Sequence, residues 1–258
     1  MEEYLKFAKD IALRAGDIMI HYFDLGEEGR EKADKTLVTK ADEEINQMVI
    51  TEVAKRFPDH AVFGEEASSS NKSKQLWSCD PIDGTTQFAK GVPIAVFSLA
   101  YVEDGKPLVG VVYDPFTKRL YSANKGSGAF LNDVPINVSK KPLNYQAIVD
   151  LEWWPEAEYE LYLPSHTLTM ETSAYVLTIC SVTQAAMKVA AGQYEGCVFA
   201  GTKGKSVDLA AAKVIVEEAG GIVTDLFGKD QRYDGDIKGG IISNGVVHKN
   251  LLSYFKLT

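Results

Sequence analysis

Apolar residues in the first part of the chain recur at helical spacing. Between residues 3 and 23 they follow at intervals of three and four, which predicts an amphipathic helix ending near Gly26. A second stripe predicts a helix that begins near Thr39 or Asp42 and stops at Pro58, because proline cannot continue a helix. The residues of this second stripe are Ile45, Met48, Val49, Val53 and Phe57.

Strand-like patterns replace the helical spacing from residue 61 onward. The segment AVFGEE reads as a short strand ending in acid, and the polar run that follows it reads as a loop. Beyond the loop, β-branched and aromatic residues dominate, and Asp104–Gly105 marks a hairpin turn. We therefore expect an antiparallel sheet. The predicted strands lie within 61–66, 75–80, 95–115 and 119–133.

The pattern becomes mixed after about residue 140, where Pro142 punctuates the chain. Predicted strands and helices now alternate, which is typical of α/β architecture. We expect an N-terminal α+β subdomain at 1–142 and a C-terminal α/β subdomain at 143–258. The predicted strands lie near 147–154, 196–200 and 221–225, and the predicted helices cover 182–191 and 207–219.

The composition indicates a folded enzyme-sized protein rather than a nucleic-acid or membrane binder. Of its 258 residues 45% are hydrophobic, enough for a sizeable core. The formal net charge of −9 would repel a phosphate backbone or an anionic membrane surface. An anionic substrate would therefore need metal ions, backbone N–H groups or a few lysines to receive it.

Cysteine and hydrophobic patterns indicate a cytoplasmic location. Three widely separated cysteines suggest neither a disulfide framework nor a zinc cluster. The charged start of the chain does not resemble a signal peptide, and no apolar run has the length of a membrane span. The four histidines are scattered, which gives no support to a zinc site or a Ser–His–Asp triad.

The segment from Trp77 to Thr86, WSCDPIDGTT, is the most informative in the chain. It carries Asp80 and Asp83 off an apolar strand into an expected sharp turn, so that both acids point at one spot. The carbonyl of Ile82 adds a further oxygen, and Mg²⁺ prefers such oxygen ligands. Taken alone, this segment could equally be a surface turn, because Asp, Pro and Gly are the usual turn residues.

Other acids occupy comparable positions. Glu65 follows a predicted strand, and Asp208 opens a predicted helix. Asp208 alone could be a helix-capping residue, and Asp42 could serve only the dipole of the second helix. Together with Asp80 and Asp83, however, these acids suggest one converging metal site.

Three segments resemble, in order and spacing, the motifs of the inositol monophosphatase family, whose superfamily also contains fructose-1,6-bisphosphatases and nucleotide 3′-phosphatases. These segments are FGEEAS at 63–68, DPIDGTTQF at 80–88 and VDLAAAKVIVEEAGG at 207–221, and the resemblance covers essentially the whole chain. It implies a sugar-phosphatase fold of alternating helix and sheet layers, with the active site between the two halves. It also implies a phosphoric monoester hydrolase that requires Mg²⁺, is inhibited by Li⁺ and forms a homodimer.

The resemblance also implies residue roles. Glu65, Asp80 and the Ile82 carbonyl would bind one Mg²⁺; Asp80, Asp83 and Asp208 would bind a second; and Glu65 would reach a third, weaker ion. Asp42 and Thr85 would position and deprotonate the attacking water, with Glu65 beside them in the catalytic set. Backbone N–H groups of Gly84 and Thr86 would hold the phosphate.

The substrate side departs from the family pattern. Gly201 stands where the inositol enzymes carry a glutamate that contacts sugar hydroxyls, which places an inositol substrate in doubt. Lys203 and Lys205 nearby could bind a second phosphate or a carboxylate, or could be solvated loop lysines. Further candidate substrate contacts are Ser181, Thr183 and Gln184.

We therefore predict a magnesium-dependent phosphatase that hydrolyses a small phosphorylated metabolite by direct attack of water. The first alternative is nucleotide 3′-phosphatase or fructose-1,6-bisphosphatase specificity on the same scaffold. The second is a non-catalytic binding or regulatory protein, which would have little physical reason to keep four carboxylates facing one another.

Overall fold

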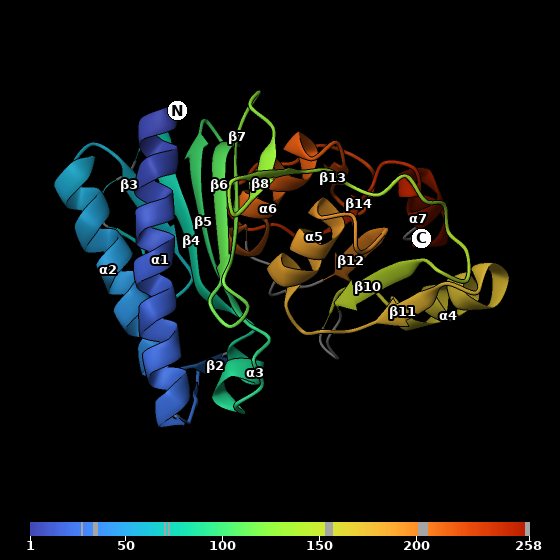
Figure 1. Ribbon diagram of the computed structural model, residues 1–258, viewed down its shortest axis with the longest axis horizontal. Helices are drawn as coiled ribbons and strands as arrows, with labels where there is room; N and C mark the ends of the chain where they lie inside the picture. Colours follow the sequence, from blue (N-terminus) through green and yellow to red (C-terminus); the bar gives the residue numbers. More distant parts are fainter. Residues whose placement is uncertain are drawn as a thin grey trace.

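The computed structural model describes residues 1–26, 28–32, 36–69, 71, 73–152, 157–200 and 206–255. Its elements form five layers that alternate between helices and sheets (Figure 1). This arrangement confirms the predicted fold class. The two sheets are joined in sequence through residues 137–147, the region of the predicted boundary between the halves.

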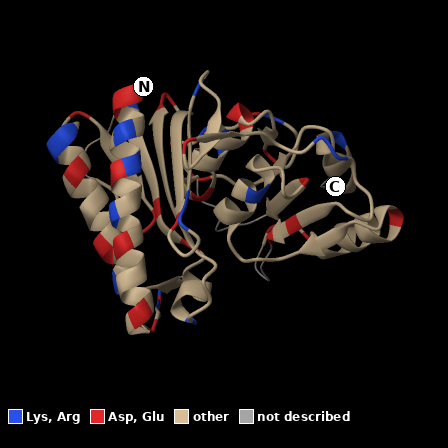
Figure 2. Ribbon diagram, viewed as in Figure 1, with Lys and Arg blue, Asp and Glu red and all other residues tan. Residues whose placement is uncertain are grey.

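Two long helices form the first layer. Helix α1 (Glu2–Leu25) buries Ala8, Ile11 and Ala15 on one face and ends at Gly26, which adopts the left-handed conformation that favours glycine. Helix α2 (Lys40–Arg56) begins at Thr39 and ends two residues before Pro58. Acidic and basic residues are interspersed along both helices (Figure 2). The first two predicted helices are thus confirmed within two residues at each end.

A seven-stranded sheet forms the second layer. Its strand order follows the sequence from β3 to β9, and every neighbouring pair is antiparallel except β3 and β4, which are parallel. The strands are β3 (Ala61–Gly64), β4 (Gln75–Asp83), β5 (Val96–Glu103), β6 (Lys106–Asp114), β7 (Arg119–Asn124), β8 (Ala129–Leu131) and β9 (Val134–Ile136). A small hairpin, β1 (Arg30–Glu31) and β2 (Leu37–Val38), and the short helix α3 (Thr85–Ala89) lie beside this layer.

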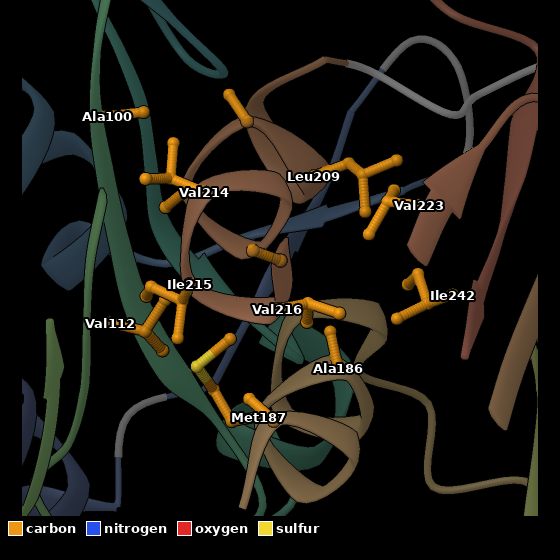
Figure 3. Close-up of a cluster of buried hydrophobic side chains, with 14 of the residues drawn as sticks. Ala100, Val112, Ala186, Met187, Leu209, Val214, Ile215, Val216, Val223 and Ile242 are labelled. Atoms are coloured by element: carbon orange, nitrogen blue, oxygen red, sulfur yellow. The ribbon is translucent and has the colours of Figure 1, made fainter. Parts of the chain in front are cut away.

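Helices α5 (Val182–Ala190) and α6 (Val207–Glu218) form the central layer, between the two sheets. Val214, Ile215 and Val216 of α6 project to several sides of the helix, toward α5 and toward strands of both sheets (Figure 3). Gly110 of β6 permits this packing, because a Cβ there would lie only 2.4 Å from the Ala211 carbonyl oxygen. One hydrophobic cluster consequently contains residues of both halves.

A five-stranded sheet and two further helices complete the molecule. The sheet order is β11-β10-β12-β14-β13, and β10 runs parallel to both of its neighbours. The strands are β10 (Ile148–Glu152), β11 (Tyr175–Leu177), β12 (Gly196–Ala200), β13 (Ile222–Thr224) and β14 (Gly239–Ser243). Helices α4 (Tyr162–Thr172) and α7 (His248–Tyr254) cover its outer face. The sequence predicted neither helix.

Candidate active site

A cleft of about 400 Å³ lies where β4, α3, α5 and α6 meet. The residues that line it come from separate parts of the chain and include every acid that the sequence singled out as a metal ligand. They are Thr36, Leu37, Glu65, Asp80, Ile82, Asp83, Gly84, Thr85, Thr86, Gln87, Glu152, Cys180, Val182 and Asp208.

Parallel pairing of β3 and β4 brings Glu65 beside Asp80. Gly64 lies opposite Cys79, and the Glu65 N–H donates to the Cys79 carbonyl at 3.0 Å. Asp80 is only 2% exposed, and its Oδ1 accepts from the Ile82 N–H at 3.0 Å. Glu65 and Asp80 each follow a member of the last β3–β4 residue pair, Gly64 and Cys79. The two acids therefore lie side by side in the lining of the same cleft.

The conformation between Asp80 and Asp83 differs from the predicted sharp turn. Strand β4 continues to Asp83, and a register shift against β5 separates the two aspartates. A bulge of this kind re-aims side chains without ending the strand. The turn follows at Gly84, whose φ of +97° favours glycine and whose Cβ would lie 2.6 Å from the Ile94 carbonyl oxygen.

The first turn of α5 holds Asp83. The Ser181 hydroxyl donates to Asp83 Oδ2 at 2.8 Å, and the Thr183 N–H donates to the same oxygen at 2.5 Å. The Thr183 hydroxyl in turn donates to the Asp208 carbonyl at 2.7 Å. These contacts connect the end of β4 to α5 and α6 and fix the orientation of the Asp83 carboxylate.

The cleft concentrates several carboxyl groups, and a bound cation would stabilise their charged forms. Burial raises the pKa of Asp80 well above its usual value, and the charges of Glu65, Asp83 and Asp208 raise it further. Burial also raises the pKa of Asp83 to about 6, against hydrogen bonds from Ser181 and Thr183 that lower it. Oxygen donors with this much concentrated negative charge fit a hard divalent ion. In the described part of the chain, however, no three His, Cys, Asp or Glu side chains already form a complete metal-binding group.

Asp42 and Thr85 meet at the edge of the cleft, as the family resemblance implies. The Thr85 hydroxyl lies 3.4 Å from Asp42 Oδ1 and 2.9 Å from the Ile82 carbonyl oxygen. Asp42 Oδ2 accepts from the N–H and the hydroxyl of Thr39, which completes a capping box at the start of α2. Burial raises the pKa of Asp42 to about 7. The capping role and the site contact thus use different oxygens of one carboxylate.

Lys32 is a site residue that the sequence did not reveal. Its ammonium lies 3.3 Å from Glu65 and 2.7 Å from Glu66, within the hairpin of β1 and β2. Burial lowers the pKa of Lys32, but the charges of Glu65 and Glu66 outweigh burial and raise it above its usual value. The position of Lys32 depends on hairpin geometry, and no motif around it signals this contact.

Glu152 is the second residue that the sequence missed. It ends β10, lies beside Cys180 in the cleft lining and is 4% exposed. Its only sequence signal is the pair of acids Asp150 and Glu152, which share one face of an otherwise apolar strand.

The structure does not place the predicted substrate contacts in the lining of the cleft. Ser181, Thr183 and Gln184 are buried and are not among the described residues that line the cleft. Ser181 and Thr183 hold Asp83, and the Gln184 amide lies 3.4 Å from Asp114. Their direct contact with substrate stays a prediction. Lys203 and Lys205 lie outside the described residues.

Known proteins resemble this chain over almost its full length. Fructose-1,6-bisphosphatase/inositol-1-monophosphatase of Thermotoga maritima is 33% identical over 250 residues, covering 96% of this chain and 94% of the relative. Histidinol-phosphatase of Chlorobaculum parvum is 34% identical over 259 residues, covering 96% and 95%. In structure, the Thermotoga maritima IMPase superposes with a TM-score of 0.88 at 30% identity, covering 98% of this chain and 97% of that protein.

The agreement extends to sequence families. The profile of the inositol monophosphatase family matches residues 1–257, which includes all three acidic segments and the helices that position them. The order of the motifs, the layered fold and the converging carboxylates therefore have one explanation: the chain belongs to the inositol monophosphatase family.

Proposed function

We propose that this magnesium-dependent phosphatase hydrolyses a small phosphomonoester by direct attack of water in the cleft at the end of β4. The observation that carries the proposal is the convergence of Glu65, Asp80, Asp83 and Asp208 on one cleft, which Gly84 and Thr86 also line. One solved relative, an IMPase/NADP phosphatase, is a complex with Mg²⁺ and phosphate. It has a TM-score of 0.79 at 27% identity, covering 98% of this chain and 92% of that protein.

Two or three Mg²⁺ ions would be held by the acids of the cleft. Glu65, Asp80 and the Ile82 carbonyl would hold the first; Asp80, Asp83 and Asp208 the second; and Glu65 a third. When bound, Mg²⁺ lowers the pKa of water and neutralises phosphate charge. Lys32 already partly neutralises Glu65, which supports a weaker third ion there. Competition of Li⁺ for these oxygen ligands would inhibit turnover.

The chain's own groups would complete the site. Asp42, with Thr85 at 3.4 Å, would accept the proton of the attacking water, because a carboxyl group with a pKa of about 7 is poised for general base catalysis at neutral pH. Backbone N–H groups of Gly84 and Thr86, at the start of α3, would hold the phosphate. Substrate contacts of Ser181, Thr183, Gln184, Lys203 and Lys205 are part of the same proposal.

The proposal is tested by phosphate release from a panel of phosphate esters with and without Mg²⁺. The panel comprises inositol 1-phosphate, fructose 1,6-bisphosphate, adenosine 3′,5′-bisphosphate, L-histidinol phosphate and NADP. We expect Mg²⁺-dependent turnover of at least one ester and its loss in Asp83→Asn. No turnover of any ester by folded, Mg²⁺-binding protein would favour a non-catalytic role, and preference for a bisphosphate would favour the alternative specificities.

An exposed apolar surface supports a homodimer. It covers α4 and the neighbouring edge strand β11 of the five-stranded sheet. Its residues are Tyr162, Leu163, Met170, Tyr175 and Leu177. We expect light scattering to give twice the mass of the chain, and the double variant Leu163→Glu/Met170→Glu to give a monomer with its turnover retained. A wild-type monomer would contradict the homodimer.

The two-subdomain division and the cytoplasmic location are also proposals. The division at residues 142/143 is supported by the separate sheets, with the cleft between them. The cytoplasmic location is supported by three free cysteines, of which Cys79 and Cys197 are buried. None of the helices in the described ranges is long and apolar enough to cross a membrane.

A further inference from the structure

The end of β10 is tied to the turn that precedes α5. Glu152, the last residue of β10, is 4% exposed, and its Oε1 accepts from the N–H of Ile179 at 3.1 Å and from the N–H of Ser181 at 3.3 Å. Cys180, between these two donors, has a φ of +60°, which a residue with a side chain rarely adopts. One oxygen of Glu152 therefore holds both flanks of a strained residue and fixes the turn.

Ser181 connects this turn to the acids of the cleft. Its N–H donates to Glu152, while its hydroxyl donates to Asp83 Oδ2 at 2.8 Å. The Thr183 N–H, two residues further along the chain, donates to the same Asp83 oxygen. Both groups that hold Asp83 thus come from the start of α5, and the Glu152 carboxyl group fixes the backbone that leads into this helix.

A second buried acid holds the Glu152 carboxyl group. Asp150 lies on the same face of β10, is fully buried and shares a hydrogen bond with Glu152. Burial and the charge of Asp150 raise the pKa of Glu152 to about 9. Burial raises the pKa of Asp150 only to about 6, because the hydrogen bond from Glu152 lowers it. At neutral pH the shared proton therefore lies on Glu152, which donates to Asp150 and accepts from the two N–H groups of the turn.

We propose that Glu152 is a positioning residue for the metal ligand Asp83. As a neutral carboxyl group, it fixes the Ser181 backbone, so that the first turn of α5 presents its two donors to Asp83 in one orientation. The inference rests on the proposed function, in which Asp83 binds Mg²⁺. Groups that hydrogen-bond to metal ligands orient them, and their loss costs about 10-fold to 100-fold in metal affinity. The role requires no contact of Glu152 with metal or substrate.

Glu152→Gln and Glu152→Met test this role. The Gln amide reproduces the protonated carboxyl group, because its oxygen can accept from Ile179 and Ser181 and its NH₂ group can donate to Asp150. Met has a similar length but offers neither a strong acceptor nor a donor. Isothermal titration calorimetry gives the Kd for Mg²⁺ without substrate. We expect this Kd to rise about ten-fold or more in Glu152→Met and less than about three-fold in Glu152→Gln.

The Asp150 charge requires a second pair of variants. Glu152→Met leaves the buried Asp150 carboxylate without its donor, which destabilises the fold independently of the metal. Asp150→Asn removes that charge, and its amide oxygen can still accept from Glu152. We therefore compare Asp150→Asn with the double variant Asp150→Asn/Glu152→Met, and expect the same rise of about ten-fold in the Kd for Mg²⁺ between them.

Glu195 provides a control for a general loss of stability. It is 2% exposed and accepts from the Ile148 N–H at 2.8 Å, at the opposite end of β10. Glu195→Met should therefore lower the free energy of unfolding in urea and leave the Kd for Mg²⁺ unchanged. A rise in Kd as large as that of Glu152→Met would mean that any weakening of β10 disturbs the site, and would overturn the proposal.

The remaining outcomes separate the two proposals. An unchanged Kd in Glu152→Met and in the double variant, beside Mg²⁺ binding by the wild type, would show that Glu152 only supports the fold. A loss in Glu152→Gln equal to that in Glu152→Met would show that the neutral hydrogen-bonding group is not what acts. Either result overturns the positioning role and leaves the phosphatase function standing. A wild type that binds no Mg²⁺ would instead overturn the proposed function, on which the role of Glu152 rests.

Discussion

The Thr85 hydroxyl lies 3.4 Å from the Asp42 carboxylate, although the two residues are 43 positions apart in the chain. Thr85 begins α3 and Asp42 lies in the first turn of α2, so their contact requires two helix starts to meet at the end of β4. Each residue also has a local partner, Ile82 for Thr85 and Thr39 for Asp42. The pair is thus fixed from both sides.

This pair predicts the acidic limb of the pH profile. Asp42 can accept a proton only when ionised, and its pKa is raised to about 7 by burial. We expect kcat/KM to rise through about pH 7 and Asp42→Asn to lower it by about 10²-fold to 10⁴-fold while abolishing that limb. Thr39→Ser, which keeps a hydroxyl donor to Asp42, is the matched control. An unchanged pH profile in Asp42→Asn would contradict the general-base role.

Replacing the Asp42 carboxyl group should stabilise the metal-free protein at high pH. The folded pKa of Asp42, about 7, exceeds its ordinary value of 3.8, so the stabilisation is complete below pH 3.8 and is lost as pH rises through 7. At pH 8 without Mg²⁺, the free energy of unfolding of Asp42→Asn should exceed that of the wild type by up to about 4 kcal/mol. The variant should therefore unfold at a higher urea concentration. The two proteins should converge near pH 4. Urea titrations at both pH values decide the point, and lower stability of the variant at pH 8 would contradict it.

Metal binding should relieve the repulsion around Asp80. Its pKa is raised by burial and by three neighbouring carboxylates, so protons and Mg²⁺ compete for the site. We expect Mg²⁺ to raise the melting temperature more at pH 8 than at pH 5. Asp80→Asn should raise the melting temperature without Mg²⁺ and abolish the Mg²⁺-induced rise. Equal Mg²⁺ shifts in the variant and the wild type would place the ions elsewhere.

Helical spacing of apolar residues predicts the helices seen as α1 and α2. The alternation of strand and helix segments after residue 140 predicts α5 and α6, and the acid before Pro81 is predicted to lie in a metal site. Helix α4 was missed, in part because Pro164 stands inside it. Pro164 lies in the first turn, where the missing N–H would have no intrahelical partner.

Long-range contacts explain most of what the sequence could not show. Lys32 contacts the cleft residue Glu65 from the β1–β2 hairpin, and Glu152 lines the cleft at the end of a parallel strand. Neither contact is signalled by a motif of the kind that marks Asp80 and Asp83. The path of β4 through Asp83 is decided by pairing with β5, which overrides the turn propensity of Pro81 and Gly84. The local sequence thus predicts the metal-binding acids, whereas the residues around the substrate depend on long-range contacts.

Gly84 should tolerate no side chain. Its φ of +97° strains other residues, and a Cβ would lie 2.6 Å from the Ile94 carbonyl oxygen. Gly84→Ala should therefore cost about 1–3 kcal/mol of stability and displace the start of α3, with loss of turnover. Gly91→Ala is the control, because Gly91 has a φ of +71° but open space around it. Similar turnover of the two variants would show that the position of α3 is unimportant.

Ser181 should act on the metal through Asp83. Its hydroxyl donates to Asp83 at 2.8 Å and accepts from the Gln184 N–H at 3.3 Å, so it both orients the ligand and caps α5. Ser181→Ala should lower the free energy of unfolding by about 1–3 kcal/mol. It should also raise the Mg²⁺ concentration for half-maximal rate by about ten-fold, because Asp83 loses the partner that aligns it.

Ser181→Thr keeps a hydroxyl at this position and should restore much of both losses. Titration of the rate with Mg²⁺, beside urea unfolding of the same proteins, separates the two roles of Ser181. Loss of the cap alone would lower stability without moving the Mg²⁺ requirement, and that result would contradict the link to Asp83. A rise in the Mg²⁺ requirement that Thr reverses would instead show that the start of α5 tunes a ligand at the end of β4.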